Sequence, residues 1–220
     1  MYLETDGIVL RQVKTLNGRR MISILTRNLG KISAGSSLSE RSRGKSALAI
    51  RPFTHGRYEL YKNRDQFSLS GAETLRSFYR IGEDVDKYMA ASYILEYTDK
   101  IAEDGLPNTD LFKLLLDFLE LMEKREKRQG TLVCGYLLRS FDLMGVGIDF
   151  SGEYEGRGDL IFKAESDIVG AMEYMAKNEL KSLENLALDD ERCKKILKFC
   201  ESYASYHLEI GELKSKEFLL

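Results

Sequence analysis

Short apolar segments that alternate with polar positions fill the first 75 residues of this 220-residue chain. In the last of them, Phe67 and Leu69 share one face while Ser68 and Ser70 share the other, which is the period of a half-buried strand. Five such segments are present, at 7–10, 21–25, 31–34, 57–61 and 67–70. Because most of them are rich in β-branched or aromatic residues, we expect five short strands.

Turn residues separate these segments in a way that favours a closed sheet. The turn Asn28-Leu29-Gly30 joins the second segment to the third, and Gly30 tolerates the positive φ that a tight turn requires. A polar turn at 62–65 joins the last two segments. The sequence therefore predicts a five-stranded OB-like β-barrel, with residues 39–50 as the insert between the third and fourth strands.

From Phe78 onward the hydrophobic period lengthens to that of helices. Residues 83–102 place Val85, Met89, Tyr93 and Tyr97 at steps of four, which predicts a helix with one apolar face.

Start and stop signals delimit the helices that follow. Asn108 precedes an apolar helix expected over 111–127, and a helix over 131–144 ends at Gly145. Two or three more helices follow residue 163, and the acidic residues 189–191 begin the last of them, which runs to about 208. A basic group suits the negative C-terminal end of the helix at 111–127: Lys124, Arg125, Lys127 and Arg128.

Residues 146–163 interrupt the helical pattern with recurrent glycines, and we expect an irregular surface loop there. The predicted fold class is therefore α+β multidomain. An N-terminal five-stranded OB-like barrel over residues 1–80 precedes an all-helical C-terminal domain over 81–220.

Charge is divided unevenly between these two parts. The whole chain is nearly neutral, at −2, yet residues 1–80 hold 15 Lys and Arg against 6 Asp and Glu. Residues 81–220 hold 18 basic against 29 acidic residues. A basic barrel joined to an acidic helical part indicates that the barrel binds a polyanion.

The basic residues of the barrel are the candidate DNA-binding residues. Guanidinium and ammonium groups beside serines and glycines can follow a phosphate backbone, although a solvated basic surface would look the same in sequence. Phe53, Tyr58, Tyr61 and Phe67 are rings on which unstacked bases could lie, or else barrel core. The candidates are Arg11, Lys14, Arg19, Arg20, Arg27, Lys31, Arg41, Arg43, Lys45, Arg51 and Arg57.

No pattern in the chain indicates catalysis, a cofactor or a metal site. No phosphate-binding loop motif occurs, and the two histidines, His55 and His207, stand far apart. The three cysteines, Cys134, Cys193 and Cys200, lack the spacing of a structural zinc site. We therefore expect a binding protein that is not an enzyme and that needs no cofactor or metal.

The cellular location expected from the sequence is the cytoplasm, with no membrane partner. No apolar run approaches the roughly 18 residues that cross a bilayer. The first residues lack the basic flank and apolar stretch of a signal peptide. An odd number of cysteines without a framework spacing is typical of reduced thiols.

Several short segments, taken in order, resemble the RecO family of bacterial recombination mediators. No single segment is diagnostic, and the resemblance rests on their order and spacing over nearly the whole chain. The segments are 5–11 (TDGIVLR), 24–31 (ILTRNLGK), 51–53 (RPF), 58–61 (YELY), 93–96 (YILE), 108–112 (NTDLF), 206–209 (YHLE) and 213–219 (LKSKEFL).

The resemblance implies an OB barrel followed by a helical domain and a role in DNA repair and recombination. It implies binding of single- and double-stranded DNA, annealing of complementary strands without ATP, and work with RecR to load RecA onto DNA coated by single-strand-binding protein. It also implies docking of the acidic, apolar C-terminal tail of single-strand-binding protein. Many members hold zinc through four cysteines, but the corresponding stretch here, residues 146–165, has none, so zinc is not carried over.

Three alternatives stay open at this point. The chain could be a protein-interaction adaptor with incidental DNA contacts, or an RNA chaperone of similar build. A nuclease would need clustered carboxylates for metal, whereas the six acids of residues 1–80 are scattered from Glu4 to Glu73.

Overall fold

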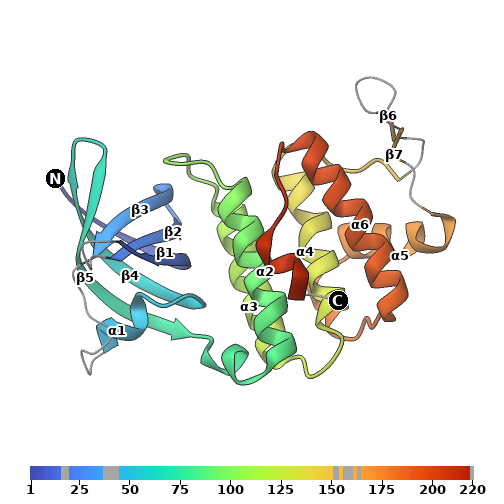
Figure 1. Ribbon diagram of the computed structural model, residues 1–220, viewed down its shortest axis with the longest axis horizontal. Helices are drawn as coiled ribbons and strands as arrows, with labels where there is room; N and C mark the ends of the chain where they lie inside the picture. The colour runs from blue at the N-terminus through green and yellow to red at the C-terminus, as the bar shows by residue number, and fades with distance from the viewer. Residues whose placement is uncertain (16–19, 37–44, 151–153, 156–160, 163–164, 219–220) are drawn as a thin grey trace.

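The computed structural model consists of a β-barrel and a group of helices that lie side by side (Figure 1). It describes residues 1–15, 20–36, 45–150, 154–155, 161–162 and 165–218. The N-terminus lies at the end of the barrel that points away from the helices (Figure 1).

The barrel is a closed sheet with the connectivity of an OB fold. Its strands follow the order β1-β2-β3-β5-β4, with β3 parallel to β5 and the other neighbours antiparallel. The strands are β1 (Tyr2–Lys14), β2 (Arg20–Thr26), β3 (Gly30–Ser36), β4 (Thr54–Asn63) and β5 (Gln66–Ser77). A short helix, α1 (Lys45–Ala49), precedes β4 within the predicted insert. The OB-like barrel predicted from the sequence is confirmed.

Inward-facing side chains of the barrel form a small core of their own. Val9, Ile22 and Ile24 are fully buried there with Tyr58. The hydroxyl of Tyr58 donates to the carbonyl of Ala49 at 2.7 Å and so ties α1 to the barrel.

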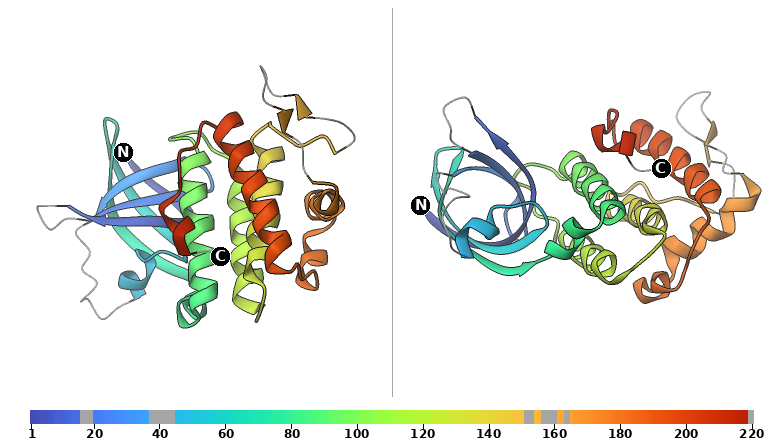
Figure 2. Two further views of the ribbon diagram at one scale, coloured as in Figure 1. Left: turned by 45° about the vertical axis from the view of Figure 1, so that its right-hand side comes forward. Right: turned by 60° about the horizontal axis from the view of Figure 1, so that its bottom comes forward.

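The helical part packs around α4, which contacts α2, α3, α5 and α6, while α2 runs between the barrel and α4 (Figures 1 and 2). Its helices are α2 (Val85–Ile101), α3 (Thr109–Lys124), α4 (Gln129–Leu143), α5 (Ser166–Lys177) and α6 (Asp190–His207), with the 3-10 helices η1 (Tyr79–Glu83), η2 (Leu180–Glu184) and η3 (Lys214–Phe218). Two helix starts are capped as predicted: Asn108 accepts from the Leu111 N–H at 2.9 Å, and Asp189 accepts from the Arg192 N–H at 2.8 Å. None of the described helices is long and apolar enough to span a lipid bilayer.

The single apolar face predicted for α2 is wrong at the start of the helix. Tyr93 and Tyr97 are buried as expected, but the side chain of Val85 is 66% exposed. Further along, Ala91 and Ile94 are buried as well. Because α2 has the barrel on one side and helices on the other, it buries several faces, and its first turn is largely exposed.

The loop predicted to be irregular over 146–163 contains two paired strands. β6 (Tyr154–Glu155) and β7 (Ile161–Phe162) run antiparallel, each two residues long. Strands this short leave no periodicity in a sequence, so the pattern could not predict them. Residues 151–153, 156–160 and 163–164 lie outside the described residues.

A shared core joins the barrel to the helices. Ile8, Leu10 and Leu25 are buried on the outer side of the barrel and belong to the same hydrophobic cluster as α2, α3 and α4. The last barrel strand ends at Ser77 and η1 begins at Tyr79. The division into domains over 1–80 and 81–220 stays a prediction, since apolar contacts cross it.

Candidate nucleic-acid interface

The predicted DNA-binding residues fall into groups with different surroundings. Arg19, Arg41 and Arg43 lie outside the described residues. Lys45 begins α1, and its side chain is also outside the described set.

Two of the candidates meet the helical part at Asp99 of α2. The Arg11 guanidinium lies 3.3 Å from one carboxylate oxygen of Asp99, and the hydroxyl of Ser23 donates to the other at 2.6 Å. The Lys31 ammonium donates to the Asp99 carbonyl at 2.6 Å and pairs with Asp104 at 3.6 Å. The Arg11 side chain remains 64% exposed, whereas that of Lys31 is only 17% exposed. Arg11 therefore stays accessible to a ligand, while Lys31 is largely occupied in joining the barrel to α2.

Arg27 and Arg57 also have partners within the molecule. The Arg27 guanidinium lies over the ring of Phe112 in α3, at 5.2 Å from its centroid. Arg57 lies 3.5 Å from Glu4 and 3.4 Å from Asp6, so two carboxylates offset its charge locally.

Lys14, Arg20 and Arg51 complete the described candidates. The side chains of Lys14 and Arg51 are exposed, and neither forms an ion pair with another described residue. Arg20 is half-buried at the start of β2. The barrel therefore keeps Arg11, Lys14 and Arg51 exposed, and Arg27 is exposed as well, over the ring of Phe112.

Of the four aromatics considered for base stacking or barrel core, Tyr58 belongs to the core. It is fully buried in the barrel core, because its side chain points inward from β4. Tyr61, three residues along the same strand, points outward and is 41% exposed beside Tyr2, with ring centroids 5.1 Å apart. Phe67 is half-buried under the Lys62 ammonium, which lies 5.3 Å from its centroid.

The fourth aromatic, Phe53, lies in a cleft between the barrel and the helical part. The cleft has a volume of about 700 Å³ and is bordered by β1, the segment after α1, α2 and η3. Figure 2 shows η3, the dark red C-terminal segment, beside α2. Arg11 and Arg51, 40 positions apart in sequence, both line this cleft.

The cleft also contains three residues that no sequence pattern had indicated. Lys100 on α2 and Lys214 on η3 belong to the acidic part of the chain, and both are exposed. Tyr88, also on α2, is 51% exposed and meets the ring of Phe53 edge to face at 5.6 Å. No local pattern marks these residues, because only the packing of α2 on the barrel, and of η3 on α2, brings them to the cleft.

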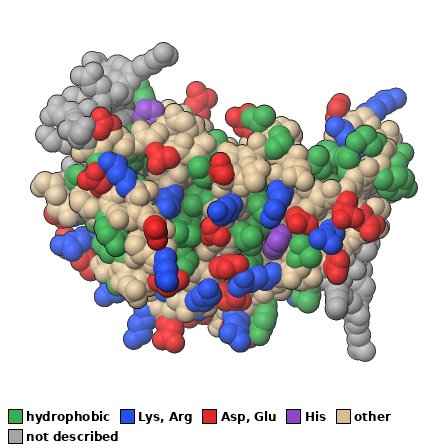
Figure 3. Space-filling view, turned by 180° about the vertical axis from the view of Figure 1, so that it is seen from behind, with side chains coloured by type: hydrophobic (Ala, Val, Ile, Leu, Met, Phe, Trp, Pro, Cys, Tyr) green, Lys and Arg blue, Asp and Glu red, His purple; other side chains and the backbone are tan. Residues whose placement is uncertain are grey.

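The surface of the helical part is mixed in charge. On the face shown in Figure 3, acidic and basic side chains are interspersed over the helices. The acidic excess of residues 81–220 is therefore not a uniform negative surface on this face.

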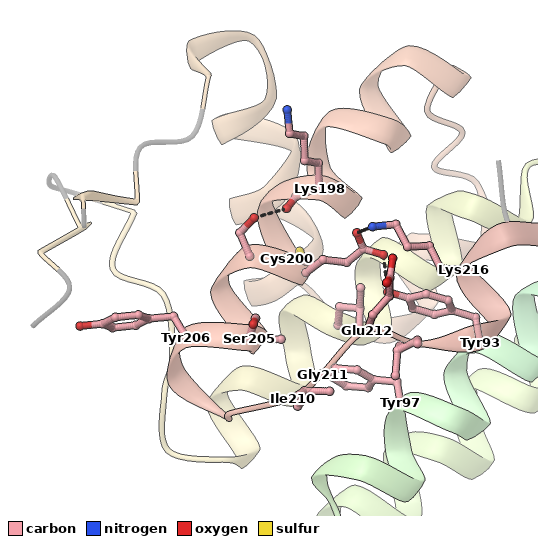
Figure 4. Close-up of a pocket in the computed structure, with 15 residues that line it drawn as sticks. Tyr93, Tyr97, Lys198, Cys200, Ser205, Tyr206, Ile210, Gly211, Glu212 and Lys216 are labelled. Carbon is pink, nitrogen blue, oxygen red and sulfur yellow. Dashed lines mark hydrogen bonds and ion pairs between the residues drawn. The ribbon is translucent and has the colours of Figure 1, made fainter. Parts of the chain in front are cut away.

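A second cavity, of about 670 Å³, lies within the helical part between α2, α6 and the segment that follows α6 (Figure 4). Leu137, Ile210 and Leu213 give it an apolar lining. At one side, Glu201 accepts from the Tyr93 hydroxyl at 3.1 Å and pairs with Lys216 at 2.6 Å. Burial, with the negative charge of Glu201 beside it, raises the pKa of Tyr93, so this phenol is a neutral hydrogen-bond donor.

The histidines belong to packing contacts in different parts of the molecule. His55 lies edge to face with Phe112 at 5.7 Å, and burial lowers the pKa of its imidazole. The ring of His207 lies 4.2 Å from that of Tyr203. Within the described part of the chain, no group of three or more His, Cys, Asp or Glu side chains is placed to hold a metal ion.

Comparison with protein families matches both parts of the chain. The family model described as "Recombination protein O N terminal" matches residues 1–78, which contain the barrel strands. The model described as "Recombination protein O C terminal" matches residues 82–158.

Individual relatives agree with these matches. A protein of Alkaliphilus metalliredigens named "DNA repair protein RecO" is 31% identical over 146 residues, which are 66% of this chain and 59% of the relative. Its namesake from a Nocardioides species is 32% identical over 152 residues, or 68% and 62% of the two chains. One from a Thermoanaerobacter species is 23% identical over 240 aligned positions, covering 99% of this chain and 96% of the relative. In the first two matches the chain spans about three fifths of the relative's length.

Proposed function

Because the chain belongs to the RecO family, we propose that it is a DNA repair and recombination mediator that binds single- and double-stranded DNA through its barrel. The observation that carries the proposal is the set of accessible cations on the barrel. Lys14 and Arg51 are exposed without a described acidic partner, and Arg11 is 64% exposed beside its one carboxylate.

These cations are suited to annealing without ATP. Two DNA strands repel each other because each carries one negative charge per nucleotide, and a protein that neutralises phosphates releases condensed counterions. Contacts to the sugar–phosphate backbone leave the base edges free, and free base edges are what pairing requires. No step of this mechanism needs a nucleotide cofactor.

Annealing also fits a role in loading RecA together with RecR, as the family implies. We include docking of the C-terminal tail of single-strand-binding protein in the proposal, and we assign it to the cavity of Figure 4. The apolar lining of that cavity suits the apolar residues of such a tail, and the exposed Lys198 on its edge suits the acidic ones.

Replacing Lys198 tests the tail site. Lys198→Glu is expected to weaken binding of a peptide with acidic residues and an apolar C-terminal end by about 5–10-fold, since it turns one attraction into a repulsion. Isothermal titration calorimetry measures this. Lys194→Glu, on the same helix but outside the cavity, is the control. Equal affinities for both variants would remove the cavity from the proposal.

A salt titration of DNA binding tests the barrel. If about five to seven phosphates are engaged, the log–log slope of single-strand affinity against salt should be roughly −3.5 to −5. Lys14→Glu is expected to weaken binding by about 5–20-fold and to reduce the steepness of that slope by about 1, as removal of a phosphate contact does. Lys127→Glu, at an exposed position just after α3 in the helical part, is the matched charge control.

Fluorescence anisotropy with a labelled strand measures the affinities, and adding the complementary strand without ATP then measures annealing. Failure to bind at low salt would contradict the proposal. An RNA strand that competes as well as DNA would favour the RNA chaperone instead.

A further inference from the structure

We propose that the cleft between the barrel and α2 is a second DNA contact, which takes a short stretch of single strand. A base would lie against Tyr88, with the phosphates near Arg11, Arg51, Lys100 and Lys214. This inference rests on the proposed DNA-binding function. It adds the helical part as a binding surface, whereas its acidic composition alone predicts that it repels DNA.

The charge balance of the cleft favours an anion. Its four cations come from β1, the segment after α1, α2 and η3, and their side chains are exposed. The cleft also contains two carboxylates, Glu96 and Asp99. Their charges must already be offset if a phosphate is to bind there.

Both carboxylates are engaged by groups of the protein itself. Glu96 accepts from the backbone N–H groups of Lys214 at 3.0 Å and Ser215 at 2.8 Å, and from the Ser215 hydroxyl at 2.7 Å. Partial burial would raise the pKa of Glu96, but these hydrogen bonds outweigh it and lower that pKa. Asp99 is only 13% exposed under Arg11 and Ser23. The cleft therefore presents its cations outward and keeps its acids occupied.

The aromatic ring in the cleft indicates unpaired bases as the ligand. Tyr88 is 51% exposed, and its contact with Phe53 holds it at the border of the cleft. Stacking of a base on such a ring is worth about 1–3 kcal/mol, and bases stacked in a duplex are not available for it. A cleft of about 700 Å³ is in the size range of small-ligand sites and does not admit a duplex.

Two variants test the cleft separately from the barrel. Tyr88→Ala is expected to lower single-strand affinity by about 5–50-fold, with duplex affinity within about 2-fold of the wild type. Lys100→Glu with Lys214→Glu is expected to lower single-strand affinity by about 10–50-fold and to reduce the steepness of the salt slope by about 1.5. Fluorescence anisotropy with matched single-stranded and duplex DNA measures both.

Matched controls exclude loss of folding and general charge effects. Tyr174→Ala removes another exposed tyrosine, 41% exposed, from α5. Lys127→Glu with Lys181→Glu makes the same charge change outside the cleft. Thermal unfolding checks that all variants remain folded. Ultraviolet crosslinking of a strand that contains 5-bromodeoxyuridine, followed by mass spectrometry, is expected to identify Tyr88.

The outcomes distinguish failure of the cleft from failure of the proposed function. The wild-type protein could bind DNA with a steep salt slope while both cleft variants bind it as the controls do. That result would overturn the proposed cleft site and leave DNA binding by the barrel in place. Equal losses of affinity for single strands and duplexes in the cleft variants would also overturn the proposed cleft site, because that site is expected to bind only unpaired bases. Absence of DNA binding by the wild-type protein overturns both proposals.

Discussion

Gly30→Ala is expected to lower the free energy of unfolding by about 3–5 kcal/mol, through backbone strain and a steric clash together. Gly30 has φ of 70°, in the left-handed region that disfavours side chains. A Cβ at this position would lie 2.5 Å from the backbone nitrogen and oxygen of Leu106. Neither backbone can give way cheaply, since the Gly105 N–H donates to the Lys31 carbonyl at 3.0 Å beside the clash.

Differential scanning calorimetry measures this effect, and for a chain of this size each kcal/mol shifts the melting temperature by about 2–4 °C. Gly105→Ala is the matched control, because its φ of 72° is close to that of Gly30 but nothing lies within 4 Å of its Cβ position. We expect a loss of only about 1 kcal/mol there. Similar losses at the two glycines would show that φ alone matters and that the approach of Leu106 does not.

Arg125→Ala is expected to lower the free energy of unfolding by about 3–4 kcal/mol, because one side chain serves four carbonyl groups. Its guanidinium donates to Leu183 at 2.8 Å, Glu184 at 3.4 Å, Leu186 at 2.5 Å and Lys127 at 2.7 Å. These bonds hold η2 and the segment after it against the end of α3. Burial lowers the pKa of Arg125, as expected for a partly desolvated guanidinium.

The neighbouring Lys124 is the control for Arg125. It is exposed on the same helix end, so Lys124→Ala is expected to change stability by less than about 0.5 kcal/mol. Arg125→Lys should recover little, since an ammonium group cannot donate to several carbonyls in a fork. Equal melting temperatures for the Lys124→Ala and Arg125→Ala variants would show that Arg125 contributes only a positive charge at the end of the helix.

Structural features with a local cause could be predicted from the sequence. Asn108 and Asp189 cap helices through N–H groups three residues away, and the turn at Gly30 depends on its own backbone. The strands were predicted for the same reason, because alternation of apolar and polar residues is visible within each segment.

Burial could not be predicted where two packing arrangements are compatible with the same pattern of apolar and polar residues. Tyr58 and Tyr61 are both aromatics of β4, and alternation places them on opposite faces without saying which face is inside. The structure buries Tyr58 in the barrel and exposes Tyr61. Val85 shows the same limit in α2, where the partners on each side of the helix decide which positions are buried.

By itself, the sequence determined the fold class, the barrel with its turns, the capped helices and the concentration of basic charge in residues 1–80. Only the tertiary structure decided which of those basic residues are accessible, because their partners are distant in the chain. The Lys31 ammonium donates a hydrogen bond to the carbonyl of Asp99, 68 positions away. One side of the cleft forms because the N–H groups of residues 214 and 215 donate to Glu96, up to 119 positions before them. Solvent exposure and ion pairing of this kind depend on contacts between distant segments, and no short-range pattern contains them.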